Sequence, residues 1–156
     1  MTVGSWKFFE RRVIGDMPMP YMVRYILFRC PAFGVMVHRF CRSDYDRALH
    51  DHPWPFITWL IGGGYCEIHN QTRDGAEVAV WRSRWSVLVR PAEWRHRVIL
   101  ESDTSGLVHP VWTLVLVGRR CQSWGFYLPT GWCHWRRHNP SNGICETEPI
   151  WLDGSD

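Results

Sequence analysis

The stretch HDHPW at residues 50–54, together with PAEWRH at residues 91–96, decides the predicted fold of this chain and most of its functional interpretation. Side chains alternate between the two faces of an extended strand, so the two histidines of an H-x-H point the same way. Pro53 and Pro55 disfavour a helix in this region. The pattern therefore aims two imidazoles into one space, where a histidine from a distant strand can complete a metal site.

The rest of the sequence predicts short strands separated by turns. Gly62-Gly63-Gly64 supplies the positive φ values that a tight turn needs, and Asp74-Gly75 is a hairpin signal. No segment shows a helical period over about ten residues or more. Short strands at roughly eight- to twelve-residue spacing predict an all-β sandwich or barrel. The expected strands are 21–29, 35–41, 56–61, 65–69, 77–81, 85–89, 95–100, 111–117 and 124–128.

Length and composition predict one intracellular domain. The chain has 156 residues, of which 46% are hydrophobic and 21% charged, a balance typical of a globular protein. Charged residues at positions 7, 10, 11 and 12 stand where a secretory signal needs an apolar run, and the uncharged run 54–66 is too short to cross a membrane. The six cysteines form no C-x-x-C pair. We therefore expect a soluble, cytoplasmic protein that does not associate with a membrane.

The two histidine stretches resemble the two sequence motifs of the cupin family. The first cupin motif has H-x-H, then a Glu and a Gly turn, and here His50-Asp51-His52 is followed by Gly62-Gly63-Gly64. The second has P-x-G-x-x-H, and here Pro91 and His96 keep that spacing. The resemblance covers roughly residues 35–128. It implies an all-β, single-domain chain with a cupin-type jelly-roll β-barrel of two antiparallel sheets.

Outside the motifs, we expect an N-terminal extension over residues 1–20, the cupin β-barrel over 21–138 and a C-terminal tail over 139–156. The run 42–54, with Gly63-Gly64-Tyr65 and Glu67, is more narrowly similar to a group of small cupin-like proteins from phages and bacteria. This likeness sharpens the expected fold and leaves the reaction open.

By position, the resemblance assigns His50, His52 and His96 as the three histidine ligands of a divalent metal. The sequence departs from the motifs in two ways: Glu93 replaces the motif Gly, and no carboxylate is present at 56–58, where the motif Glu falls. The expected centre is therefore either three histidines with waters, or three histidines with a carboxylate that Glu67 supplies from the next strand.

Three neutral imidazoles leave coordination positions for water, substrate or dioxygen. Fe(II) would suit an oxygenase, whereas Zn, Mn or Ni would suit an isomerase or other Lewis-acid chemistry on a small molecule. We expect Tyr65 and Glu67 to be the catalytic acid/base or a substrate contact, and Arg47 or Arg95 to bind an anionic group of the ligand. Two alternatives stay open: a non-catalytic cupin that binds a nucleotide or sugar, and a metal-free, epimerase-like cupin with a histidine as base.

The expected partner is a small molecule. Arginine outnumbers lysine 17 to 1, but the arginines are spread along the chain rather than clustered, so we do not expect a nucleic-acid partner. The chain has no P-loop and no G-x-S-x-G elbow, which disfavours P-loop nucleotide hydrolysis and serine hydrolase chemistry. Cupins often dimerise through an edge strand, so the resemblance also implies a homodimer.

Overall fold

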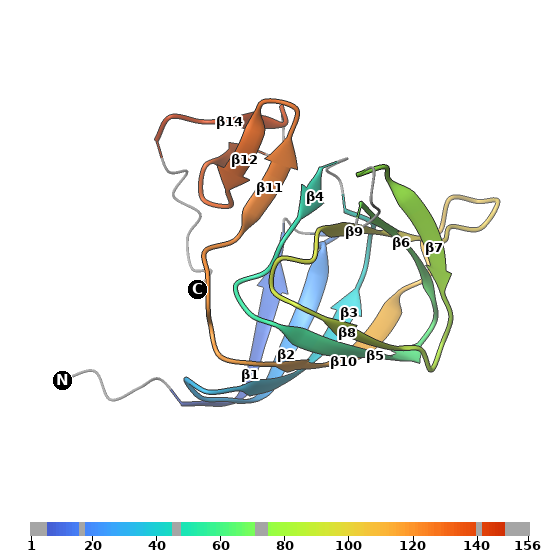
Figure 1. Ribbon diagram of the computed structural model, residues 1–156. Coiled ribbons are helices and arrows are strands. Elements are labelled where there is room, and N and C mark those ends of the chain that lie inside the picture. The colour runs from blue at the N-terminus through green and yellow to red at the C-terminus, as the bar shows by residue number, and fades with distance from the viewer. Residues whose placement is uncertain (1–5, 16–17, 45–47, 71–74, 140–141, 149–156) are drawn as a thin grey trace.

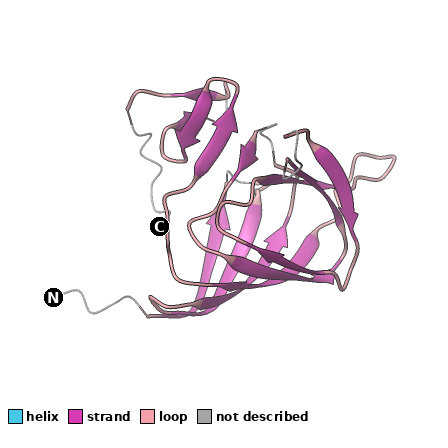
Figure 2. Ribbon diagram, viewed as in Figure 1, coloured by secondary structure: helices cyan, strands magenta, loops and turns pink. Residues whose placement is uncertain are grey.

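The structure is a computed structural model that describes residues 6–15, 18–44, 48–70, 75–139 and 142–148. The regular elements in these ranges are strands, and none of these residues lies in a helix (Figures 1 and 2). The predicted all-β class is therefore confirmed. It follows that no helix in the described ranges could span a membrane.

Two six-stranded antiparallel sheets curve around a common interior (Figure 1). The first sheet has the order β1 (Lys7–Ile14), β2 (Met22–Arg29), β3 (Gly34–Phe40), β10 (Val111–Val117), β5 (Phe56–Gly62) and β8 (Val87–Arg90). The second sheet has the order β12 (Gly131–His134), β11 (Gly125–Leu128), β4 (Leu49–His50), β9 (His96–Leu100), β6 (Tyr65–His69) and β7 (Val78–Arg82). A third pairing joins β13 (His138–Asn139) to β14 (Ile144–Cys145).

Strand β10 shows why these segments form sheets. Its residues alternate, with Val111, Thr113, Val115 and Val117 buried between residues that are less buried or exposed. Such a period of two is what a strand with one buried face requires. Full burial of a Val, Leu or Met side chain contributes roughly 1.5–3 kcal/mol, so the inward row stabilises the barrel. One apolar cluster contains Leu60, Tyr65, Leu88, Val98, Leu100 and Val111, and a second contains Ile26, Met36, Phe56, Val115 and Val117.

The predicted turn at Gly62-Gly63-Gly64 is also confirmed. Gly63 has a φ of 77°, in the left-handed region that glycine adopts without steric cost. The turn connects β5 of the first sheet to β6 of the second sheet. Because β6 carries Tyr65 and Glu67, the direction of this turn sets where two of the predicted site residues lie.

Strand β1 is an element that the sequence reasoning did not predict. It lies within residues 1–20, for which the sequence predicts only an extension, and it pairs with β2 along its length. Charged residues interrupt its apolar pattern, since Lys7, Glu10 and Arg12 share one face with each other. The strand completes the first sheet at its edge.

The C-terminal hairpin, formed by β11 and β12, lies within the range predicted for the barrel and continues the second sheet past β4 (Figure 1). The pairing of β13 with β14 extends into the range predicted for the tail. A disulfide joins Cys133 of β12 to Cys145 of β14. The sequence gives no sign of this pair, because no C-x-x-C spacing marks it. The predicted division into extension, barrel and tail stays a prediction, and residues 149–156 of the tail lie outside the described ranges.

Candidate metal centre

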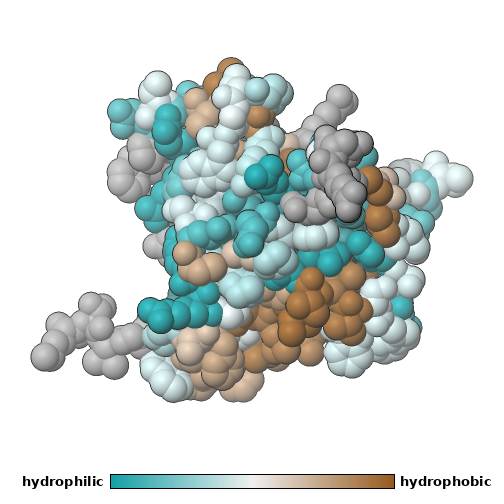
Figure 3. Space-filling view, in the orientation of Figure 1, coloured by the Kyte–Doolittle hydropathy of each residue, from teal (hydrophilic) through white to brown (hydrophobic). Residues whose placement is uncertain are grey.

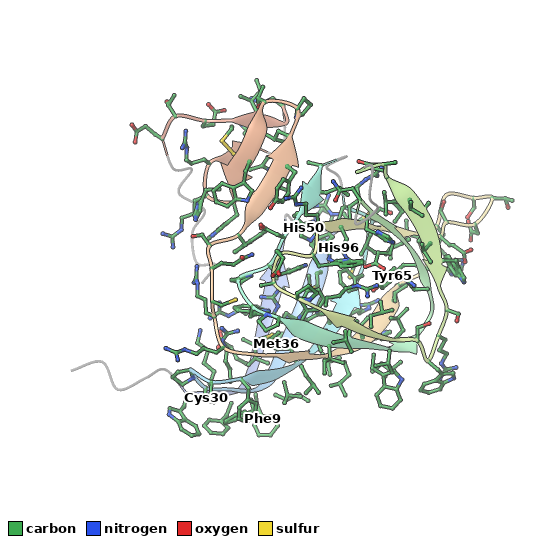
Figure 4. All side chains as sticks on the ribbon, in the orientation of Figure 1. Phe9, Cys30, Met36, His50, Tyr65 and His96 are labelled. Atoms are coloured by element: carbon green, nitrogen blue, oxygen red, sulfur yellow. A yellow bond between two sulfur atoms is a disulfide. The ribbon has the colours of Figure 1, made fainter. Side chains whose placement is uncertain are left out.

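The three histidines of the two motifs meet inside the barrel. His50 of β4 pairs directly with His96 of β9, and His52 follows two residues after His50. One ligand nitrogen from each of the three lies within 4.8 Å of the other two. Figure 4 shows the His50 and His96 side chains between the two sheets, toward the end of the barrel where β4 lies. The H-x-H spacing and the distant P-x-x-x-x-H therefore bring three imidazoles together, as the sequence predicts.

The spacing of these nitrogens fits a bound divalent ion. The Nε2 atoms of His52 and His96 are 2.8 Å apart. Two imidazole nitrogens that each lie about 2.0–2.1 Å from one ion can be at most about 4.2 Å apart. The His52–His96 distance is inside that limit and is that of a hydrogen bond, whereas the set as a whole extends to 4.8 Å, so the rings would have to shift slightly for all three to reach one ion. A centre of imidazole nitrogens alone suits Fe, Zn, Ni or Cu better than Mg or Ca, which favour oxygen ligands.

Glu67 lies behind His96, at the centre of a buried network. The side chain is fully buried, and its Oε1 atom lies 2.9 Å from His96 Nδ1. Arg82 Nε and Arg90 Nη2 each donate to Oε2 at 2.8 Å, and Trp94 Nε1 donates to Oε1 at 3.1 Å. Burial alone would raise the pKa of Glu67, but the hydrogen bonds from His96 and Arg90 and their charges outweigh burial and hold the pKa well below its usual range. Glu67 is therefore a carboxylate.

The Glu67–His96 contact sets the tautomer of His96. A carboxylate only accepts hydrogen bonds, so His96 Nδ1–H must donate to Glu67. When this imidazole is neutral, its lone pair is on Nε2, which faces His52. Metal-binding histidines are commonly held this way, with the second ring nitrogen bonded to a carboxylate. Glu67 thus orients His96. The group of candidate ligands consists of the three histidines and does not include Glu67.

Backbone contacts and aromatic rings position His50 and His52. The His52 backbone N–H donates to Ala92 O at 2.9 Å, and Gln122 Nε2 donates to His52 O at 2.9 Å. The His52 ring packs on Phe56 with 4.4 Å between ring centroids, and the His50 ring lies 5.8 Å from Phe126. These contacts hold the segment 50–52 against the PAEWRH stretch and against the C-terminal hairpin.

Asp51 points away from the centre, as expected for the middle residue of an extended H-x-H. Its carboxylate is buried and accepts hydrogen bonds from Gly125 N at 2.7 Å and from Tyr127 Oη at 2.9 Å. The triplet 50–52 therefore points two imidazoles into the barrel, while the Asp51 carboxylate between them binds β11 on the other side.

Burial favours the neutral imidazole at His50 and at His52. Burial lowers the pKa of His50 to about 4, with the nearby Asp44 opposing the shift and His96 adding to it. The pKa of His52 is also well below its usual range, chiefly because of burial and then because of His96 and His50. A neutral imidazole has the lone pair that a metal requires. At neutral pH the centre is thus ready to bind a cation.

The other predicted site residues lie in different environments. Tyr65 is buried inside the barrel, where burial and then the charge of Glu67 raise its pKa above its usual range. Arg95 is exposed, with its guanidinium carbon 4.1 Å from the centroid of the Tyr127 ring. Arg47 lies outside the described residues. The acid/base role of Tyr65 and Glu67 and the ligand-binding role of the two arginines stay predictions.

Sequence reasoning missed the residues that support the centre. Arg82, Arg90 and Trp94 converge on Glu67, and Asp51 anchors β11. Arg90 directly precedes the second motif and Trp94 lies within it, so their nearness to His96 in the sequence was the available signal. Arg82 lies opposite Tyr65 in the β6–β7 pair, and only the register of that pair reveals it.

Comparison with known proteins gives matches only at the level of structure. No protein-family model and no curated protein matches the sequence. A cupin-2 domain from Rhodospirillum rubrum matches with a TM-score of 0.57 at 12% identity, over 78% of this chain and 77% of that one. The Fe(II) form of HppE matches with a TM-score of 0.52 at 12% identity, over 69% of this chain, which spans only 56% of HppE. A protein from Ralstonia eutropha, named as a candidate mannose-6-phosphate isomerase, matches with a TM-score of 0.52 at 14% identity, over 68% of this chain and 89% of that one.

These matches and the topology agree with the resemblance carried by the two motifs. The structure has two antiparallel sheets around an interior that holds three motif histidines, and one of the matched structures is described as a cupin domain. The fold of this chain is therefore a jelly-roll β-barrel like that of the cupin domain it matches.

Proposed function

We propose that this chain is a metal-dependent cupin that acts on a small molecule, with a divalent ion held by His50, His52 and His96. The observation that carries the proposal is the convergence of three imidazoles, one of them oriented by a buried carboxylate. A bound ion would polarise a substrate oxygen or, if it were iron, supply redox chemistry. HppE is a structural neighbour whose described forms contain Fe(II) and substrate, which supports iron and an oxygenase reaction as the first possibility to test, ahead of Zn, Mn or Ni.

The ionisation of the inner residues favours a reaction in which the ion, rather than a side chain, does the chemistry. Efficient proton transfer needs a group whose pKa lies near the working pH. The pKa of Glu67 is far below that range and the pKa of Tyr65 is above it. We therefore assign Glu67 the role of positioning His96, and we propose Tyr65 as a neutral hydrogen-bonding group inside the barrel.

The same pKa values bear on the two alternatives. A metal-free, epimerase-like cupin needs a histidine base, and the lowered pKa values of His50 and His52 make both weak bases. The second candidate that we retain is a non-catalytic cupin that binds a small ligand such as a nucleotide or sugar. It is favoured by the engagement of Glu67 with His96 and two arginines, which leaves this carboxylate no free oxygen for acid/base work.

Metal content per chain, measured by elemental analysis after reconstitution with Fe(II), Zn, Mn or Ni, tests the proposal. We expect about one ion per wild-type chain and loss of most of it in both His52→Ala and His96→Ala. His38→Ala and His69→Ala are matched controls, because they remove barrel histidines outside the cluster, and they should keep the metal. Wild type without stoichiometric metal, or full retention in His96→Ala, would leave only the metal-free readings.

We also propose that the protein forms a homodimer through the outer face of β5 and β8. Cross-strand pairs place Ile57 beside Val89 and Trp59 beside Val87, and all four side chains are exposed, Val89 by 68%. Figure 3 shows an apolar surface in this part of the molecule. Since β8 is an edge strand, a second copy seated there would cover both the edge and the face. Sedimentation should give a dimer for wild type and a monomer for Val89→Lys, whereas a monomeric wild type would refute the proposal.

Localisation in the cytoplasm stays a proposal. The Cys133–Cys145 disulfide is a type of bond found mainly in oxidising compartments. Thiol titration of protein taken directly from the host under denaturing conditions measures whether this bond forms there.

A further inference from the structure

A second group of polar side chains lies inside the barrel, on the inner face of the first sheet. Cross-strand pairs place Arg24 of β2 opposite His38 of β3, and His38 opposite Thr113 of β10. Two residues further along β3 and β10, on the same face, the pair is Met36 and Val115, both buried. The three polar residues therefore form a row on a face that is otherwise apolar, a placement that is costly unless the row has polar partners.

Arg24 is a cation in this row without a carboxylate partner. Its Nε donates to His38 Nε2 at 3.1 Å, which fixes the plane of the guanidinium. Among the residues that the structure describes, no carboxylate forms an ion pair with Arg24, and no side chain accepts a hydrogen bond from its Nη1 or Nη2. Arg24 also keeps part of its surface accessible. The Nη end thus presents the two-donor fork that matches a carboxylate or phosphate.

The surroundings of Arg24 favour an anion. Burial lowers the pKa of the Arg24 guanidinium to about 10; Tyr21 opposes this shift, whereas the charges of Arg12 and Arg29 add to it. Arg12 is the direct cross-strand neighbour of Arg24 on β1. A bound anion would offset both the burial of this cation and the repulsion between like charges.

Thr113 supplies an independent indication of a missing partner. The residue is fully buried, and its Oγ1 has no hydrogen-bond partner among the described residues. Buried hydroxyl groups in native proteins are nearly always hydrogen-bonded to protein, water or ligand. An anionic oxygen bound near Arg24 would accept the hydrogen bond that this hydroxyl can donate.

The row also lies close to the histidine centre. Met36, two residues from His38 on the same face of β3, packs in the cluster that contains Phe56, and the Phe56 ring lies 4.4 Å from the His52 ring, centroid to centroid. We propose that Arg24 and Thr113 form a subsite that binds an anionic oxygen group, a carboxylate or a phosphate, of the small molecule that reaches His50, His52 and His96. His38 is the positioning residue, because it accepts from Arg24 Nε and leaves the Nη fork to the ligand. The inference rests on the proposed function in one respect: one small molecule is taken to occupy both the anion subsite and the histidine centre.

Arg84 provides the matched control. It is exposed, belongs to none of the predicted sites, and its guanidinium carbon lies 4.4 Å from the centroid of the Trp85 ring. Both residues are arginines of the barrel, so a comparison of the two separates a specific subsite from a general attraction of anions to a basic protein.

The test measures the binding of inorganic phosphate and of acetate to metal-stripped protein by isothermal titration calorimetry in Tris chloride buffer. We expect wild type to bind at least one of the two anions at one site per chain. Arg24→Gln should bind that anion at least about tenfold more weakly, because a charge-assisted hydrogen-bonded pair is lost. Arg84→Gln should bind it as wild type does. Binding of neither anion by wild type, or an equal loss in the two variants, overturns the subsite.

Two further variants keep the test decisive if Arg24→Gln does not fold. Thr113→Val replaces a hydroxyl by a methyl group of similar size, and Arg24→Lys keeps the charge but removes the fork. We expect both to weaken anion binding by a few-fold. Unchanged affinity in both variants overturns the subsite.

Metal content of the same samples separates this inference from the proposed function. Arg24→Gln should keep the metal content of wild type, because Arg24 is not among the candidate ligands. A wild-type protein that takes up no metal but binds phosphate through Arg24 would refute the metal centre and leave the subsite standing. A metal-loaded wild type whose stripped form binds neither anion would refute the subsite and leave the centre standing.

Discussion

The cluster around Met36 and the centre around His96 occupy the same barrel but are stabilised by different interactions (Figure 4). Met36 packs with Ile26, Phe56 and Val115, and any one of these contacts is weak and replaceable. His96 instead depends on Glu67, whose charge is balanced by arginines. Removal of one member of such a network leaves other charges buried without a partner. Stability and metal binding should therefore respond to different substitutions, except at Phe56, whose ring packs on His52, and at Glu67, where the two meet.

The largest effect is expected at that meeting point. Glu67→Met removes the carboxylate and leaves Arg82 and Arg90 without their shared partner. Disruption of a buried ion pair of this kind costs about 3–5 kcal/mol of unfolding free energy. The variant should also bind metal about 10–100-fold more weakly, because the orientation of His96 is lost. Urea unfolding and metal titration measure the two effects.

The matched control for Glu67 is Glu77→Gln. Glu77 also pairs with an arginine, Arg97, but its side chain is 49% exposed. Exposed ion pairs contribute about 0–1 kcal/mol, so neither stability nor metal affinity should change much. Similar losses in the two variants would contradict the role assigned to the buried network.

The next effect should fall on stability alone. Met36→Ala creates a cavity in the apolar cluster, and such substitutions cost about 2–5 kcal/mol. Metal content per folded chain should stay at the wild-type value, because Met36 belongs neither to the candidate ligands nor to the ion-pair network around Glu67. Leu116→Ala, at a position 44% exposed on the outer face, should change neither quantity appreciably. Loss of metal in folded Met36→Ala would show that the two regions are not separable.

The smallest expected effect is a dependence of stability on pH. The pKa of His50 is about 4 in the folded metal-free protein and about 6.5 in the unfolded chain. The unfolded chain therefore binds more protons between these values, so the folded state is fully stable above pH 6.5 and loses stability as the pH falls toward 4. The loss from His50 is at most about 3 kcal/mol.

His50→Gln separates this effect from the titration of carboxylates. The difference in unfolding free energy between wild type and this variant should shrink as the pH falls from 7 to 4.5, as measured by urea unfolding of metal-stripped protein. A constant difference across this range would mean that burial does not keep His50 neutral.

The regions of the molecule differ in how much of their structure could be predicted from the sequence. Alternation along 65–69 and 111–117 predicted β6 and β10 to the residue, because one face of each strand is buried. Strand β1 escaped prediction, since its charges hide the alternation and only β2 supplies its partner. The three histidines were predictable because the spacing of each motif fixes the direction of its imidazoles.

The supporting residues were not predictable in the same way. The sequence predicted Glu67 near the centre, but its bond to His96 Nδ1 depends on the register of the β6–β9 pair, which no local pattern encodes. Arg24 interrupts an apolar strand, where a charge suggests a solvent-facing position, although it faces inward beside His38. Such contacts depend on how distant strands align, which one sequence does not reveal.

Anomalous X-ray diffraction from crystals of protein purified without chelator and reconstituted with Fe(II) or Zn tests the central claim most directly. We predict one strong anomalous peak among the imidazole nitrogens of His50, His52 and His96, at about 2.0–2.2 Å from each, with Glu67 still bonded to His96 Nδ1. A well-ordered barrel without a peak at this position, or with its metal bound elsewhere, would contradict the metal centre.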